Sequence, residues 1–194
     1  MRPTVGITLC LATFASLAAA QTSDAGADQA LSTSLAATAK AMHASIRRNL
    51  AEAAESMPAE NYEFKPTPQI RTFAQLVGHV TNANLLFCSA AKGEPYPSKT
   101  NAETLKSKDA ALKALLDSLA YCDAVYQGTT DANFGERARV SGLGNKPTET
   151  TRGAILMFNT THNNEHYGNI VIYLRLKGVV PPSTARAQAG STRQ

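Results

Sequence analysis

The chain contains no tryptophan among its 194 residues, and only 6% of them are aromatic. Positive charge is also sparse: 19 lysines and arginines stand against 15 acidic residues, and Arg47-Arg48 is the densest basic spot. A nucleic-acid-binding surface normally combines a stripe of lysine and arginine with aromatic side chains. Because the sequence offers neither, we exclude nucleic acid as a partner.

Long hydrophobic runs are almost absent as well. The one that occurs, from Val5 to Leu17, follows the basic start Met1-Arg2 and precedes a run of three alanines. It is too short to span a bilayer permanently, and small residues at its end are the pattern that signal peptidase needs. We therefore expect residues 1–20 to be a signal peptide that is cleaved near Ala20-Gln21. The mature protein would then be periplasmic or secreted, with no stable membrane anchor.

Alternating strand patterns and internal repeats are missing too, and helical periodicity takes their place. Four amphipathic stretches repeat apolar residues every three or four positions, and proline or glycine residues follow each of them. The expected helices run from Leu31 to Met57, from Thr72 to Phe87, from Leu105 to Tyr126, and from near Thr148 to Leu176. Helices of this length pack as an all-α four-helix bundle.

The bundle is expected to form one domain over residues 31–182. Residues 21–30 are small and polar, which is typical of a disordered leader, and residues 183–194 are expected to be a flexible tail. A capping box formed by Thr72 and Gln75 should start the second helix. The first helix is expected to bury Leu31, Leu35, Met42, Ile46, Leu50, Ala53 and Met57, and the last helix Ile155, Phe158, His162, His166, Ile172 and Leu176.

The absence of a C-x-x-C-H motif excludes a covalently attached haem, but histidines are well placed for a metal ion. His162 and His166 lie four residues apart, so both project from one face of the last helix. That face is its buried stripe, where imidazole nitrogens cost stability unless they find partners. A divalent metal is one such partner, and His79 on the inner edge of the second helix could supply a third ligand. The alternative is a set of hydrogen-bonded core histidines.

Two further residues require an assignment. His43 lies beside Met42 at the margin of the first stripe, and we expect it to be a surface residue. The segment from His162 to His166 also matches H-x-x-E-H, the inverted zincin pattern, in which Glu165 would be the base of a zinc peptidase. Such peptidases need another carboxylate ligand downstream, and no acidic residue follows His166. We therefore expect Glu165 to be a solvated carboxylate.

Three segments resemble the DinB-like (DinB/YfiT) family, and the similarity spans roughly Leu31 to Pro182. They are the helix start Thr72-Phe-Ala-Gln-Leu-Val-Gly78-His79, the approach Tyr62-Glu-Phe-Lys-Pro66, and the final helix His162-Asn-Asn-Glu-His166-Tyr-Gly168 with its ending Gly178-Val-Val-Pro181-Pro182. The resemblance implies a bundle in up-down-down-up order. It also implies one divalent ion (zinc, nickel, iron or manganese) held by His79, His162 and His166. His43 matches no ligand position of the family.

Three neutral ligands leave the ion its full charge and at least one open position, which is the arrangement of a catalytic site. Two hypotheses follow. The protein is a metal-dependent enzyme with a small-molecule substrate, either a hydrolase or a thiol transferase of the kind the family contains. Otherwise it is a metal-binding or structural module without turnover. Export argues against the transferase, because thiol cofactors are chiefly cytoplasmic. No general base can be assigned, and a homodimer is compatible with either hypothesis.

Cleavage of the signal peptide would remove Cys10 and leave Cys88 and Cys122 of the three cysteines. These two lie near the ends of the second and third helices. In the order that the resemblance implies, those helices are parallel, which places both cysteines at the same end of the bundle. An exported protein can oxidise such a pair, and we predict a disulfide. The alternative is two unpaired cysteines in the core.

Overall fold

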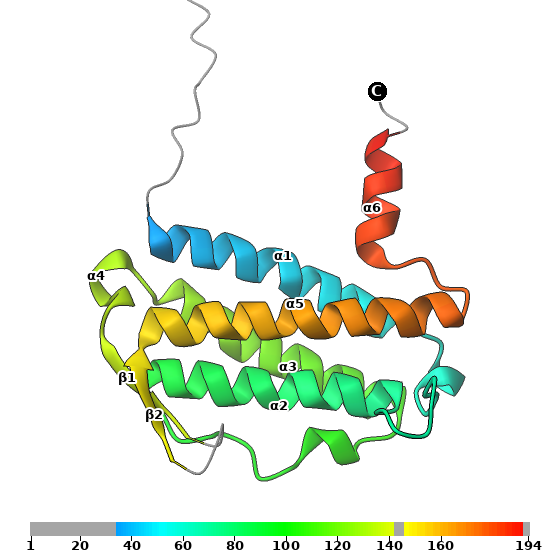
Figure 1. Ribbon diagram of the computed structural model, residues 1–194, viewed down its shortest axis with the longest axis horizontal. Helices are drawn as coiled ribbons and strands as arrows, with labels where there is room; N and C mark the ends of the chain where they lie inside the picture. The colour runs from blue at the N-terminus through cyan, green and yellow to red at the C-terminus, as the bar shows by residue number, and fades with distance from the viewer. Residues whose placement is uncertain (1–33, 142–145, 192–194) are drawn as a thin grey trace, which may run out of the picture. The chain divides into compact units, whose positions relative to one another are not determined.

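The structure is a computed structural model and describes residues 34–141 and 146–191. Four long helices make up the body of the protein (Figure 1): α1 (Leu35–Ser56), α2 (Phe73–Lys92), α3 (Lys108–Gln127) and α5 (Arg152–Leu176). The shorter elements are η1 (Ala59–Asn61), η2 (Ala102–Thr104), α4 (Asp131–Phe134), β1 (Arg137–Val140), β2 (Thr148–Thr151) and α6 (Pro182–Ser191). The predicted all-α four-helix bundle is confirmed. The predicted signal peptide and leader lie outside the described residues.

Contacts between helix ends give the direction of each helix. The Lys108 amine at the start of α3 donates to the carbonyl oxygens of Glu55 and Met57 at the end of α1. At the end of α3, the Tyr126 hydroxyl donates to the carbonyl of Leu156 near the start of α5. The Tyr173 hydroxyl near the end of α5 donates to the carbonyl of Arg71, just before α2. Helices α2 and α3 therefore end where α1 and α5 begin. None of the helices within the described ranges is both long and apolar enough to cross a membrane.

The start of α2 follows the local sequence signal. The Thr72 hydroxyl accepts a hydrogen bond from the Gln75 backbone at 3.2 Å, and the Gln75 side chain accepts one from the Thr72 backbone at 2.9 Å. This capping box satisfies two backbone donors that the first turn would otherwise leave unpaired. Gly93 ends the helix in the left-handed conformation, with φ of 78°. These two ends fix the position of His79 along α2.

Helix α1 buries a different face from the expected one. Leu35 and Met42 are exposed, whereas Ala36, Ala39 and His43 are buried. The second half of the stripe, from Ile46 onward, is buried as predicted. Small alanine side chains let neighbouring helices approach closely, because the distance between two packed helices depends on the side chains at the contact. The larger apolar residues were therefore a misleading guide to the packed face of the first two turns.

Three features differ from the sequence expectation. The prediction of no strands is wrong, because β1 and β2 form an antiparallel pair with Arg137 opposite Thr151 and Val140 opposite Thr148. Helix α5 accordingly starts at Arg152, after the N-cap Thr151, rather than near Thr148. The strands are short and mostly exposed: β1 alternates polar and apolar residues over only four positions, and β2 contains no apolar residue. Where a flexible tail was expected, helix α6 occupies Pro182–Ser191.

Two close contacts tie the interior together. A Cβ atom on Gly78 would lie 2.4 Å from the carbonyl oxygen of Ala102, so η2 rests directly against the backbone of α2. At the other end of the bundle, a disulfide joins Cys88 of α2 to Cys122 of α3, with Cα atoms 5.4 Å apart. The first contact holds the segment that follows Ala102 beside His79. The second fixes α2 against α3.

Candidate metal centre

Three histidines converge at the surface between α2 and α5. The Nε2 atom of His162 lies 3.3 Å from that of His79 and 3.1 Å from that of His166. One nitrogen from each ring lies within 4.8 Å of the other two, and no other group of this kind occurs in the described ranges. In a tetrahedral site with ligands at about 2.0–2.1 Å, neighbouring ligand atoms lie roughly 3.3 Å apart. The structure thus brings together the three histidines that the sequence singled out, at a spacing that suits one ion.

The chemistry of these rings also fits a metal ion. Burial, together with the neighbouring His166 and His79, lowers the pKa of His162 to about 4. Burial likewise lowers the pKa of His166 from its ordinary value. Both rings are therefore neutral at pH 7, and neutral imidazole is the form that binds metal. The Nδ1 atom of His162 is buried and has no hydrogen-bond partner among the described residues. A cation at the centre would give the converging Nε2 atoms, rather than this Nδ1 atom, a common partner.

A carboxylate orients one of the three rings. The Nδ1 atom of His79 lies 3.0 Å from Oε1 of Glu103, and the Nε–H of Arg71 donates to Oε2 of the same carboxylate at 3.0 Å. Burial acts to raise the pKa of Glu103, but the hydrogen bonds from Arg71 and His79 outweigh it and lower the pKa below its ordinary value. An ionised Glu103 accepts a hydrogen bond and so favours the tautomer of His79 that carries its proton on Nδ1. The Nε2 atom then has a free lone pair, which faces the other histidines.

Sequence reasoning missed both Glu103 and Arg71. Glu103 follows His79 by 24 residues, in a crossing segment that has no helical periodicity. Arg71 directly precedes the N-cap of α2, where a basic residue has no expected role. The one signal that could have pointed to this contact was Gly78, since a glycine inside a helix often marks a close approach of another backbone.

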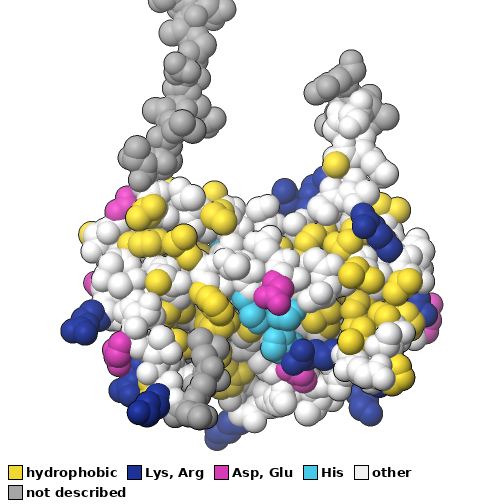
Figure 2. All heavy atoms as spheres, in the orientation of Figure 1, with side chains coloured by type: hydrophobic (Ala, Val, Ile, Leu, Met, Phe, Trp, Pro, Cys, Tyr) yellow, Lys and Arg dark blue, Asp and Glu magenta, His cyan; other side chains and the backbone are white. Residues whose placement is uncertain are grey.

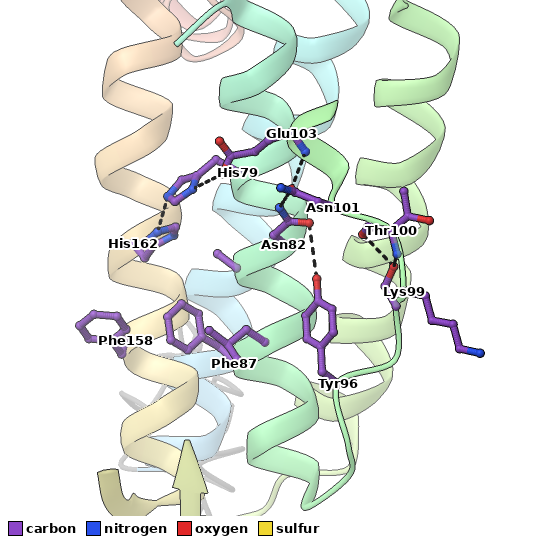
Figure 3. Close-up of a pocket in the computed structure, with 13 residues that line it drawn as sticks. His79, Asn82, Phe87, Tyr96, Lys99, Thr100, Asn101, Glu103, Phe158 and His162 are labelled. Carbon is purple, nitrogen blue, oxygen red and sulfur yellow. Dashed lines mark hydrogen bonds and ion pairs between the residues drawn. The ribbon is translucent and has the colours of Figure 1, made fainter. Parts of the chain in front are cut away.

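Two clefts flank the histidines. The first has a volume of about 670 Å³ and is lined by His79 and His162 together with Phe87, Phe158 and Asn82 (Figure 3). The second, of about 570 Å³, includes His166, Arg71 and Tyr173 in its walls. Figure 2 shows the histidines at the surface of this face, with charged side chains beside them and hydrophobic side chains on either side. The candidate centre is therefore accessible to small molecules.

The clefts account for two of the three errors in the predicted stripe of α5. Phe158, Ile172 and Leu176 were expected to be buried, and all three are exposed. Phe158 lines the first cleft and Ile172 the second. The buried face of α5 instead carries Asn159, Asn163, Tyr167, Ile170 and Leu174, among others. Glu165 is exposed, as expected for a solvated carboxylate.

The prediction for His43 is wrong. Its side chain is only 3% exposed and stacks on Tyr126, with ring centroids 3.9 Å apart. Its Nε2 atom lies 2.9 Å from Oδ1 of Asp123, and the Nε–H of Arg47 donates to Oδ2 of the same carboxylate at 2.7 Å. Burial lowers the pKa of His43, although the hydrogen bond to Asp123 opposes this effect. The residue is part of the core and lies apart from the other three histidines.

Comparisons with known proteins agree with this architecture. The family model described as the DinB superfamily matches residues 42–170. A DinB-like protein from Bacillus cereus is similar with a TM-score of 0.59 at 15% identity, over 71% of this chain and 89% of that chain. A DinB-like protein from Bacillus subtilis gives 0.56 at 19% identity, over 73% and 92%.

A mycothiol-dependent maleylpyruvate isomerase is a further structural neighbour. Its TM-score is 0.55 at 14% identity, over 70% of this chain and 60% of that chain. At these identities the solved structures show a shared fold alone. A comparison with curated proteins finds no match.

Proposed function

The chain belongs to the DinB superfamily, and from this premise we propose that it binds one divalent metal ion through His79, His162 and His166 to act on a small molecule. The observation that carries the proposal is the convergence of three Nε2 atoms between two clefts. Three neutral ligands leave the ion its full charge, and it would supply Lewis-acid chemistry at its remaining positions.

The protein's own residues would hold and orient this donor set. Glu103 keeps the proton of His79 on Nδ1, and Arg71 keeps the carboxylate in place. The amide of Asn169 lies 3.4 Å from Nδ1 of His166. Outer partners of this kind orient metal-binding rings and raise their basicity.

The clefts favour an enzyme over a closed structural module. A structural site normally fills its coordination with four protein ligands, whereas a catalytic site keeps a position for water or substrate. In the described residues, no fourth histidine, cysteine or carboxylate joins the cluster. A substrate could reach the ion from either cleft. A hydrolase and a transferase both remain compatible with this arrangement, and a module without turnover is the alternative.

Elemental analysis of protein purified from its native compartment tests the proposal. We expect one divalent ion per chain in the wild type and none in His79→Ala or His166→Ala. His43→Ala should retain the ion, because His43 lies outside the cluster. A metal-free wild type that also fails to bind added zinc or cobalt would sink the proposal.

We also propose that the protein is exported and begins near Gln21 after cleavage of its signal peptide. The apolar run from Val5 to Leu17 and the alanines after it support this proposal. N-terminal sequencing of protein from the periplasm or the culture medium should read from Gln21. A protein that starts at Met1 in those fractions would contradict it.

A further inference from the structure

Arg71 presents unused hydrogen-bond donors beside the histidines. Its Nε–H donates to Glu103, and its backbone carbonyl accepts a hydrogen bond from the Tyr173 hydroxyl at 2.7 Å. The side chain is 44% exposed. Within residues 34–141 and 146–191, its two terminal nitrogens have no hydrogen-bond partner. The guanidinium is therefore anchored on one edge and offers the other edge to a ligand.

That edge belongs to the second cleft. Arg71 lines this cleft of about 570 Å³ together with His166, so a ligand there can meet the guanidinium and the metal centre at once. Asn169 and Gln69 are other polar residues of the wall, whereas Pro66, Ile70, Leu76 and Ile172 make much of the remainder apolar. The cleft thus combines one cationic position with an aliphatic surface.

The charge balance selects an anion. Three neutral imidazoles leave the full double charge on a bound ion, and Arg71 adds a further positive charge. The carboxylates of Glu103 and Glu165 do not fully offset these charges. A planar guanidinium fork matches a carboxylate, which can accept two parallel hydrogen bonds from it.

Building on the metal site proposed above, we propose that the second cleft binds the carboxylate of a small aliphatic acid through Arg71. The substrate of this protein would then carry a carboxylate on a short apolar body that lies along Ile70 and Ile172. Its reacting end would be directed to the histidine side of the cleft.

The first cleft offers no equivalent cation. The one lysine in its wall, Lys99, extends away from His79 and His162 in Figure 3. Near the histidines its wall also carries the carboxylate of Glu103, which would repel an anion, and uncharged residues such as Phe87 and Asn82. Selection for a negative charge therefore resides in the second cleft.

The test compares two probes of similar shape, butyrate and its neutral amide butanamide, on cobalt-loaded protein by calorimetry. The wild type should prefer butyrate. Arg71→Gln should weaken butyrate binding by about tenfold to a hundredfold, as expected for loss of a charge-assisted hydrogen bond. It should change butanamide binding by less than about twofold, and Arg71→Lys should restore part of the preference.

Arg175→Gln is the matched control. Arg175 is exposed on the same helix as Ile172 and does not line the cleft. The variant removes one positive charge and should leave both affinities within about twofold, since solvent and salt screen an exposed charge that does not contact the ligand. An equal loss of butyrate binding in this variant would show a general charge effect and overturn the proposal.

The cobalt titration that precedes calorimetry separates this proposal from the one it rests on. A wild type without stoichiometric cobalt binding defeats the metal site itself. If cobalt binds and Arg71→Gln, saturated with metal, retains wild-type affinity for butyrate, only the carboxylate site is overturned. A wild type without preference for butyrate, or an Arg71→Gln variant that loses butanamide equally, has the same consequence.

Discussion

A histidine–carboxylate–arginine triad occurs twice in the protein, once in the core and once beside a cleft. In one, His43 contacts Asp123, which is paired with Arg47; in the other, His79 contacts Glu103, which is paired with Arg71. Asp123 contacts the Nε2 atom of His43, whereas Glu103 contacts the Nδ1 atom of His79. The remaining nitrogen of His43 is buried without a partner among the described residues, and its ring stacks on Tyr126.

In the second triad, the ring nitrogen that does not contact the carboxylate, Nε2 of His79, lies beside a cleft. The side chain of His79 is 27% exposed, and its Nε2 faces that of His162. A histidine–carboxylate–arginine triad is therefore not a functional signature by itself. The two histidines differ in which ring nitrogen contacts the carboxylate and in what surrounds the other nitrogen, and this difference separates the buried His43 from His79, for which we propose a metal-binding role.

Removal of one proposed metal ligand should produce the largest difference between the two regions. His162→Ala should weaken zinc binding by on the order of a thousandfold, which corresponds to about 4 kcal/mol. The rise in melting temperature that zinc gives the wild type should vanish, because a ligand stabilises only the state that binds it.

The matched variant is His43→Ala, in the triad of His43, Asp123 and Arg47. It should lower the free energy of unfolding by about 2–4 kcal/mol, as large-to-small changes in a core do, and by the same amount with zinc or with chelator. Thermal melts of both variants in zinc and in EDTA check this. An equal loss for His162→Ala in both conditions would show that His162 is a core residue only.

Loss of the disulfide should affect the buried region and spare the metal site. The Asn159 amide lies 3.8 and 4.0 Å from the two sulfurs and 3.4 Å from the Tyr126 hydroxyl, so the bond lies next to the residues that contact His43. Cys88→Ser with Cys122→Ser should lower the free energy of unfolding by about 3–4 kcal/mol. Urea unfolding and zinc titration measure the two quantities.

The bond itself can be tested separately. Mass spectrometry of unreduced protein that lacks residues 1–20, and therefore Cys10, should find no thiol that reacts with an alkylating agent. Two reactive thiols would contradict the disulfide. A fall in zinc affinity after reduction would contradict the independence of the two regions.

Neutralising the carboxylate of each triad, Glu103 or Asp123, should distinguish the two triads by a smaller effect. Glu103→Gln should weaken zinc binding by about tenfold to a hundredfold, as loss of outer partners of metal ligands does. Asp123→Asn should leave zinc affinity unchanged and lower the free energy of unfolding by about 1–2 kcal/mol, because it disturbs a partly buried hydrogen bond. Zinc titrations and urea unfolding of both variants check this. Equal effects of the two variants on zinc affinity would contradict the assignment of different roles to the two triads.

The sequence was sufficient to single out the three histidines that converge, but not the residues that contact them. Helical spacing places His162 and His166 on one face, and the capping box at Thr72 fixes the position of His79 on α2. These are short-range signals. Glu103 reaches His79 through a tertiary contact between η2 and α2, and no periodicity encodes such a contact.

The error for His43 has a different origin. On α1, the apolar pattern favoured a face with Leu35 and Met42, but packing is closer on the face with Ala36 and Ala39, which buries His43. A helical rotation of one residue was enough to move this histidine from the expected surface into the core. The β hairpin escaped detection because its short, exposed strands contain few apolar residues.

The smallest effect is expected at Glu165. Its side chain is exposed and makes no hydrogen bond among the described residues, although it directly precedes His166. Glu165→Gln should change zinc affinity by less than about twofold at physiological salt, because screening weakens exposed charges. A zinc titration measures it, and a loss as large as that of Glu103→Gln would reopen the peptidase interpretation of the H-x-x-E-H motif.

The contact between Gly78 and Ala102 has a consequence for how this site can evolve. A side chain at position 78 would collide with the carbonyl of Ala102, so the segment that carries Glu103 would have to leave α2. The glycine and the acid should therefore be inherited together. In an alignment of relatives, chains with a larger residue directly before the first metal histidine should have lost the acid in the crossing segment. Such chains would have to orient that histidine by another partner.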